Sequence, residues 1–121
     1  MKVTGLFVNA QRTITVPPGH VVFNQGEAGS EMFGVVSGSI QLWTGDRLLA
    51  TLGPDDVFGE MAIVDGSPRM ATAVASSETV LAVIDKRLFL FLIHETPTFA
   101  LSVMSAMANR FRALGAANAG S

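Results

Sequence analysis

The residues best placed to do chemistry lie in one sixteen-residue segment, Phe58–Ala73, which reads FGEMAIVDGSPRMATA. Arg69 carries a planar fork of donors that matches two oxygens of a phosphate group. Glu60 carries a carboxylate that can accept a hydrogen bond from a sugar hydroxyl. Gly59 allows the backbone to come close to a ligand, because it has no side chain. An anion clamp beside a hydroxyl acceptor indicates a site for a sugar phosphate.

The backbone of this segment is expected to complete the anion site. Residues 60–64 predict one helical turn, whose first amide groups have no acceptor within the helix and attract anions. The turn formers Gly66, Ser67 and Pro68 are expected to reverse the chain and return Arg69 toward that turn. A lone Glu and Arg would more simply form a surface ion pair beside an ordinary loop. The whole string favours the binding site over that interpretation.

Short strands separated by turns are expected to position this segment. β-Branched and apolar runs predict strands at Thr13–Val16, Val21–Phe23, Met32–Ser37, Ser39–Trp43, Arg47–Leu52, Val57–Phe58, Ala71–Ala75 and Thr79–Asp85. Several short strands with regularly spaced turns are typical of an all-β barrel or roll. The predicted fold class is therefore mainly β, with an antiparallel β-roll over about residues 13–85.

Two helices are predicted after the strands, over about residues 86–114. The first spans Lys86–Glu95, with Asp85 at its N-cap, and the second has Thr96 as N-cap and Pro97 in its first turn. Gly115 is expected to end the second helix and to leave residues 115–121 as a disordered tail. Apolar residues of that helix recur at spacings of four and three, which predicts a face that packs on the roll: Ala100, Met104, Met107, Phe111 and Leu114.

Composition narrows the class of protein. A chain of 121 residues with 49% apolar and 15% charged residues predicts one folded domain over residues 1–121. A net charge of -2 with scattered basic residues argues against direct nucleic-acid binding, as does the short stretch after Leu114. The longest apolar run, Leu88–Ile93, is too short to span a membrane. With no cysteine and no convincing signal peptide, the expected location is the cytoplasm.

Catalytic machinery is not expected. His20 and His94 are the only histidines, whereas a cupin-type metal enzyme needs a cluster of His and carboxylate ligands. The chain has neither a Gly-x-Ser-x-Gly elbow nor a Gly-x-x-x-x-Gly-Lys-[Ser/Thr] loop. Glu60 is a lone candidate base. The sequence thus predicts no catalytic residue, no metal ligand and no cofactor, and a metal-dependent cupin is the least favoured alternative.

The segment Phe58–Ala73 resembles the phosphate-binding cassette of the cyclic-nucleotide-binding domain family, which includes the catabolite activator protein, protein kinase A regulatory subunits and cyclic-nucleotide-gated channels. The cassette pattern there is Phe-Gly-Glu, a short helix of small and hydrophobic residues, then Pro-Arg, a small residue, Ala and Thr or Ser. Residues 22–38 (VFNQGEAGSEMFGVVSG) resemble the family's strand and glycine signature, and residues 53–59 (GPDDVFG) resemble its lead-in to the cassette. The resemblance covers roughly Thr13–Leu114. Gly34 departs from it, because the family usually has a larger residue there.

By this resemblance, Glu60 would accept from the ribose 2′-hydroxyl and Arg69 would pair with the exocyclic oxygens of the cyclic phosphate. Backbone groups of four further residues would complete the cradle: Gly59, Met61, Ala62 and Met70. Where the family has Thr or Ser after the arginine, the hydroxyl favours cGMP. Met70 has no such donor, so the resemblance implies cAMP, with cGMP as the alternative ligand.

The resemblance implies a ligand sensor in which the nucleotide repositions the C-terminal helices. In the family the last helix forms a dimer seam or a lid over the nucleotide, which implies a homodimer or an effector protein as partner. The competing hypothesis is a non-catalytic interaction module that has the same fold, a vestigial pocket and the same dimer helix. The intact Glu60 and Arg69 favour the sensor.

Overall fold

The computed structural model describes residues 5, 7 and 10–119, and within them the chain forms two four-stranded antiparallel sheets. The strand order is β1-β8-β3-β6 in one sheet and β2-β7-β4-β5 in the other. The strands are β1 (Thr13–Val16), β2 (Val21–Phe23), β3 (Glu31–Ser37), β4 (Ile40–Thr44), β5 (Arg47–Leu52), β6 (Val57–Phe58), β7 (Thr72–Ala75) and β8 (Thr79–Asp85). The predicted antiparallel β-roll is confirmed, and strand ends differ from the prediction by one residue at most.

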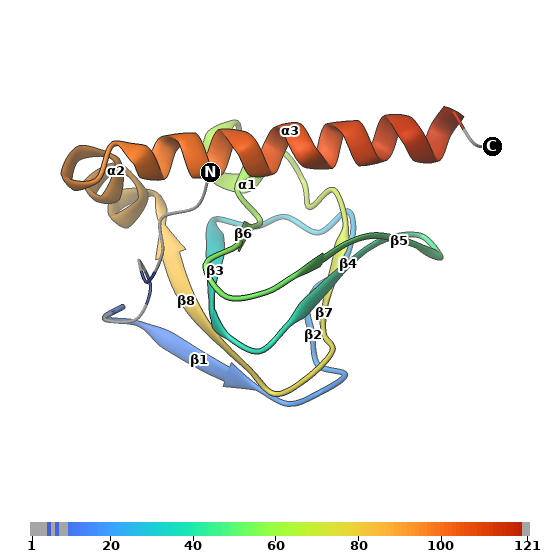
Figure 1. Cartoon of the computed structure of the whole chain (residues 1–121), viewed down its shortest axis with the longest axis horizontal. Helices are drawn as coiled ribbons and strands as arrows, with labels where there is room; N and C mark the ends of the chain where they lie inside the picture. Colours follow the sequence, from blue (N-terminus) through green and yellow to red (C-terminus); the bar gives the residue numbers. More distant parts are fainter. Residues whose placement is uncertain (1–4, 6, 8–9, 120–121) are drawn as a thin grey trace.

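Three helices accompany the strands in the described residues: α1 (Met61–Val64), α2 (Lys86–Glu95) and α3 (Thr98–Ala119). The long α3 lies across one end of the roll, with α2 at its beginning and α1 beside it (Figure 1). None of the helices described here is both long enough and apolar enough to cross a membrane.

The first C-terminal helix, α2, has the predicted bounds. The carboxylate of Asp85 accepts a hydrogen bond from the amide of Leu88 at 2.8 Å, which is the predicted N-cap. Thr96 has a different role from the one predicted. It forms the C-cap of α2, where its amide donates to the carbonyl of Leu92 at 2.8 Å, and α3 starts after Pro97, at Thr98.

The prediction that α3 ends at Gly115 is wrong. The helix continues through Ala119, so most of the expected tail is helical, while residues 120–121 lie outside the described part. A single glycine costs an exposed helix about 1 kcal/mol relative to alanine. The alanines that follow, Ala116, Ala117 and Ala119, have the highest helix propensity and offset that cost.

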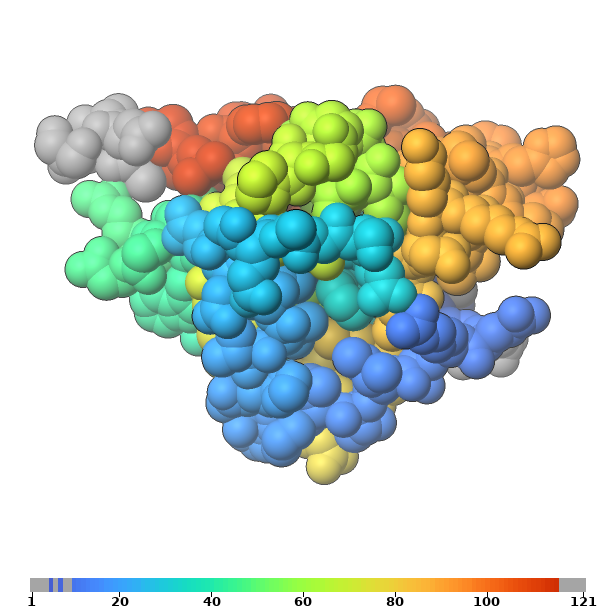
Figure 2. Space-filling model, turned by 180° about the vertical axis from the view of Figure 1, so that it is seen from behind, coloured from blue at the N-terminus to red at the C-terminus, as the bar shows by residue number. Residues whose placement is uncertain are grey.

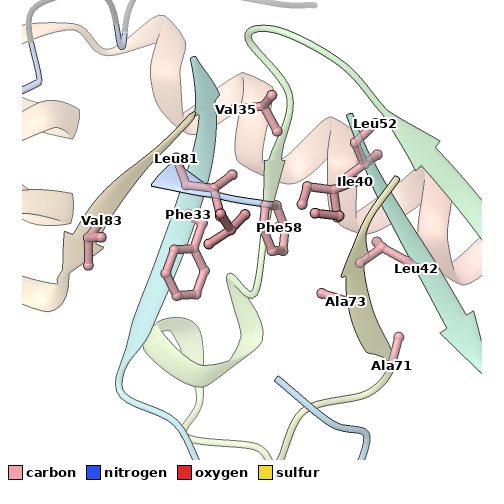
Figure 3. Packing of buried hydrophobic residues seen from close by; sticks show 12 residues of the cluster. Phe33, Val35, Ile40, Leu42, Leu52, Phe58, Ala71, Ala73, Leu81 and Val83 are labelled. Carbon is pink, nitrogen blue, oxygen red and sulfur yellow. The ribbon is translucent and has the colours of Figure 1, made fainter. Parts of the chain in front are cut away.

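The main core lies inside the roll, between the two sheets. Side chains alternate between the two faces of a strand, so Phe33, Leu81, Val83 and Phe58 point into the roll from three strands of one sheet. Figure 3 shows Phe33, Leu81 and Phe58 facing side chains of the other sheet, among them Ile40, Leu42, Leu52 and Ala73. This interior fixes β6, and with it Phe58, the first residue of the cassette.

A second core lies on the outer face of the β1-β8-β3-β6 sheet, beneath the helices. The alternate residues of the same strands contribute to it, and α3 contributes Phe99 and Val103. Its buried members are Phe7, Met32, Val57, Ile63, Ala82, Ile84, Phe99 and Val103. Because β6 contributes to both cores through Val57 and Phe58, the cassette starts from a firmly held position.

The face of α3 that packs on the roll differs from the predicted one. Phe99, Val103 and Arg110 are buried, whereas Met104 and Phe111 of the predicted stripe are 61% and 54% exposed. Met107 is half-buried and packs against the second core, as predicted. The apolar spacing of four and three residues predicted a helix correctly. Two sets of positions along this helix have that spacing, and the spacing alone does not tell which set is buried.

Candidate functional site

Arg69 occupies a buried slot next to β2. It is 8% exposed, and its guanidinium carbon lies 4.1 Å from the centroid of the Phe23 ring. Its Nη1 donates to the carbonyl of Gly59 at 3.1 Å. Its Nε is also buried but has no hydrogen-bond partner among the residues that the structure describes. A buried cation with an unused donor is unusual in a folded protein and is suited to receive an anion.

Gly59 is required at its position for two reasons. Its φ is +79°, a backbone conformation that residues with a side chain rarely adopt. A Cβ at this position would also lie 2.8 Å from Nη1 of Arg69. The absence of a side chain therefore brings the guanidinium against the backbone where the cassette begins.

The connection between β2 and β3 holds the far end of the cassette. The amide of Arg69 donates to the carbonyl of Glu27, and the amide of Gly26 donates to the carbonyl of Arg69, both at 2.8 Å. The amide of Gln25 donates to Oγ1 of Thr72 at 2.9 Å. Figure 2 shows this connection crossing the molecule directly beside the α1 region. The two segments that carried the sequence resemblance are thus bonded to each other.

Glu60 lies at the start of α1 and is 4% exposed. Its Oε1 is 3.3 Å from Nη1 of Arg110, which comes from α3 and is 5% exposed. Nη2 of Arg110 donates to the carbonyl of Val57 at 2.5 Å. The cassette is therefore joined to α3 by a buried ion pair, so a change at Glu60 affects the helix directly.

Burial controls the ionisation of these groups. It raises the pKa of Glu60 above its ordinary value of 4.5, although the charge of Arg110 acts in the opposite direction. Burial also lowers the pKa of Arg69 and that of Arg110, against the opposing effect of nearby carboxylates. The site concentrates charge where water is largely excluded, which is common at functional sites.

The interpretation of Glu60 and Arg69 as a surface ion pair is wrong, because both side chains are buried and Glu60 pairs with Arg110 instead. Sequence reasoning missed Arg110. The signal was present in the helix spacing, since Phe99, Val103 and Arg110 lie on the same buried face. A charged residue on a core-facing stripe has to be paired, so it points to a buried partner.

All six residues that the sequence proposed line one small cavity: Gly59, Glu60, Met61, Ala62, Arg69 and Met70. Phe23, Leu42, Leu49 and Arg110 line it as well. Its volume is about 20 Å³, whereas pockets for small-molecule ligands typically hold about 300–1,000 Å³. A groove of about 370 Å³ between β5 and α3 adjoins it and shares Leu49 and Arg110. The cavity alone is therefore much smaller than a typical ligand pocket, whereas the groove beside it has the volume of one.

The two histidines lie on separate elements. His20 follows the turn after β1, and His94 lies in the last turn of α2. Within residues 5, 7 and 10–119, no group of three or more His, Cys, Asp or Glu side chains could hold a metal ion.

Comparison with known proteins gives consistent matches. Residues 13–96 match the family model described as the cyclic nucleotide-binding domain. The chain is 36% identical over 101 residues to the cyclic AMP receptor protein of Thermus thermophilus, covering 79% of this chain and 47% of that protein. It is 40% identical over 93 residues to a cyclic nucleotide-gated potassium channel of Mesorhizobium japonicum, covering 77% of this chain and 26% of the channel.

The fold agrees with a solved structure of the same kind. The crystal structure of the Thermus thermophilus catabolite activator protein superimposes with a TM-score of 0.71 at 34% identity, covering 84% of this chain and 50% of that one. This chain spans about half the length of that relative, or less in the case of the channel. From the matched residues and the shared fold, the chain belongs to the cyclic-nucleotide-binding domain family.

Proposed function

We propose that this chain is a cytosolic, non-catalytic sensor that binds cAMP in preference to cGMP in the cavity between the cassette and β5. The observation that carries this proposal is the buried guanidinium of Arg69, whose Nε has no partner. An isolated buried donor costs stability unless a ligand satisfies it. A member of this family would satisfy it with the cyclic phosphate.

Each lining residue has a role in this proposal. Arg69 pairs with the exocyclic phosphate oxygens, and the backbone of Gly59, Met61, Ala62 and Met70 closes around the phosphate. The buried carboxylate of Glu60 accepts from the ribose 2′-hydroxyl. Met70 offers an apolar side chain instead of a hydroxyl, so it gives the guanine amino group of cGMP no acceptor. This supports cAMP as the preferred ligand, as does the name of the Thermus relative.

The ion pair between Glu60 and Arg110 provides the route for the signal. A nucleotide needs more space than the present 20 Å³, and α3 bounds that space through Arg110. A ligand shifts a conformational equilibrium only when it binds one arrangement more tightly than the other. Opening of the cavity repositions Arg110, and the movement of α3 is the output of the sensor.

The exposed face of α3 is the proposed contact with a second copy of this chain. Leu101, Met104 and Phe111 are 49%, 61% and 54% exposed. With the half-buried Ala108, they recur at spacings of three and four residues along one face of the helix. That spacing is the a/d pattern by which two helices pack together. A homodimer through this face would turn movement of α3 into a change between subunits.

Calorimetric titration of nucleotide-stripped protein tests the proposed ligand. We expect cAMP to bind at micromolar concentration or tighter, about −8 kcal/mol or better, with cGMP weaker. The control ligand is 5′-AMP, which lacks the cyclic phosphate and is expected to bind much more weakly. Folded, nucleotide-free protein that gives no binding with either cyclic nucleotide would favour the interaction module instead. Equal affinity for 5′-AMP would contradict a cassette specific for the cyclic phosphate.

A further inference from the structure

Phe7 fills a depression on the outer face of the β1-β8-β3-β6 sheet. Its side chain is 3% exposed. Gly34 of β3 and Ala82 of β8 are register partners, so two small residues lie opposite each other in mid-sheet. A Cβ on Gly34 would lie 2.5–2.6 Å from three atoms of the Phe7 ring. The ring thus occupies the space that a side chain at position 34 would need.

The same ring contacts the beginning of α3. Phe7 and Phe99 pack edge to face, with ring centroids 6.4 Å apart. Phe99 is fully buried and also packs against Phe89 of α2, at 5.9 Å. Phe7 therefore lies between the sheet and the junction of the two C-terminal helices and contacts both.

A second contact to the roll is made two residues before Phe7, by Gly5. The amide of Gly5 donates to Oδ1 of Asp55 at 2.9 Å. Asp55 has a φ of +73°, which is a strained conformation for a residue with a side chain. Two residues later, the carbonyl of Val57 accepts the hydrogen bond from Arg110. Phe7 thus contacts the start of α3, and Gly5 contacts the loop that leads to the Arg110 contact.

We propose that Phe7 is an intramolecular latch that favours the closed arrangement, in which Arg110 of α3 pairs with Glu60, over the arrangement that accepts the nucleotide. This inference rests on the proposed function. In the proposed function the nucleotide moves α3, and in the present arrangement the beginning of α3 packs on the Phe7 ring. Any contact that stabilises the closed arrangement lowers the apparent affinity by reducing the population that can bind.

Two substitutions remove the Phe7 contact, one by changing the ring and the other by changing the strand beneath it. Phe7→Ala removes the ring, and Gly34→Ala places a methyl group where the ring lies, which expels it. In each variant we expect at least ~5-fold tighter binding of cAMP, the lower end of typical coupling between sites. In the ligand-free protein, we expect faster amide hydrogen exchange in α3. Because Gly34→Ala leaves Phe7 intact, it tests the latch even if Phe7→Ala does not fold.

Two controls separate a latch from general destabilisation. Val16→Ala truncates a residue that is 5% exposed in the core inside the roll, so it should lower stability without tightening cAMP binding. In the Phe7→Ala background, Gly34→Ala should have little further effect on affinity or stability, since the clash is gone. Independent, additive effects of the two substitutions would contradict the contact.

The outcomes for the latch and for the ligand are distinguishable. Unchanged or weaker cAMP binding in both variants, with unchanged exchange in α3, would overturn the latch. If the wild-type chain binds neither cyclic nucleotide, the proposed function fails. In that case the exchange of α3 in ligand-free Phe7→Ala still decides whether Phe7 holds the helix.

Discussion

Two buried arginines define the chemistry of the site at the scale of residues. Arg110 pairs with Glu60 and donates to the carbonyl of Val57. Arg69 stacks on Phe23, donates one hydrogen bond to Gly59 and leaves Nε unpaired. Arg110 therefore belongs to a structural ion pair, whereas Arg69 keeps one donor without a partner. This difference supports the proposal that the phosphate binds at Arg69, while Arg110 links the cassette with α3.

The proposed preference for cAMP rests on Met70. Met70→Thr adds a hydroxyl beside Arg69 and should strengthen cGMP binding by about 1 kcal/mol relative to cAMP, the net value of one hydrogen bond. Met70→Val is the matched control, because valine has the shape of threonine without the hydroxyl. Competition titrations with both nucleotides measure the preference. A shift toward cGMP of equal size in both variants would show that side-chain volume, and not the hydroxyl, decides the preference.

Glu60 is expected to make stability depend on pH in an unusual direction. Burial raises its folded-state pKa above the unfolded value of 4.5, so between these two values the folded state binds more protons than the unfolded state. The contribution of this carboxyl to the free energy of unfolding is therefore greatest below pH 4.5. It is lost as the pH rises through the raised folded-state pKa.

The comparison of wild type with Glu60→Gln isolates this effect. The pKa values of Glu27 and Asp65 are lowered, chiefly by hydrogen bonds, so these groups act in the opposite direction but equally in both proteins. Urea unfolding of ligand-free protein from pH 4 to 7 measures the difference. We expect Glu60→Gln to gain stability relative to wild type as the pH rises above 4.5. A constant difference across that range would mean that Glu60 titrates normally.

Among single residues, the sequence identified the cavity lining and missed its partner on α3. Gly59, Glu60 and Arg69 could be predicted because their spacing within one short segment has a chemical meaning. Arg110 lies fifty residues from Glu60, and no local pattern joins them. The contact of Phe7 could not be predicted either, because only the sheet register brings Gly34 and Ala82 together beneath its ring.

At the scale of elements, α3 has two apolar faces with different roles. Phe99 and Val103 pack on the second core, whereas Leu101, Met104 and Phe111 are exposed. A helix with unpartnered apolar residues along a second face is typical of an interaction surface. The sequence predicted the helix and its periodicity. It could not select the buried register, because that depends on how the roll and the helix meet.

Phe111→Glu tests the dimer face of α3. A carboxylate placed in an apolar seam loses hydration without gaining a partner, so dimerisation should weaken on the order of tenfold or more. Leu48→Glu is the control, since Leu48 is 49% exposed but lies on β5 and not on α3. Sedimentation velocity across a concentration series measures the assembly. A wild-type chain that stays monomeric throughout, with and without cAMP, would refute the dimer face.

At the scale of the molecule, the roll lies between the cassette and α3 and holds the two in contact. Both cores draw on the alternating residues of β3, β6 and β8, so the sheet positions the cassette on one side and α3 on the other. The strands could be predicted because their turns and β-branched residues are local signals. The small size of the cavity could not be predicted, because it results from contacts between distant parts of the chain.

The most direct test of the central claim is the affinity of Arg69→Ala for cAMP, measured by calorimetry beside Arg12→Ala. Arg12 is an exposed arginine that pairs with Glu31 at 2.6 Å, so its removal controls for the loss of one positive charge. We expect Arg69→Ala to lose about 2–5 kcal/mol of binding free energy, and Arg12→Ala to bind like wild type. If folded Arg69→Ala binds cAMP as tightly as wild type, the phosphate does not bind at this cassette and the account is wrong.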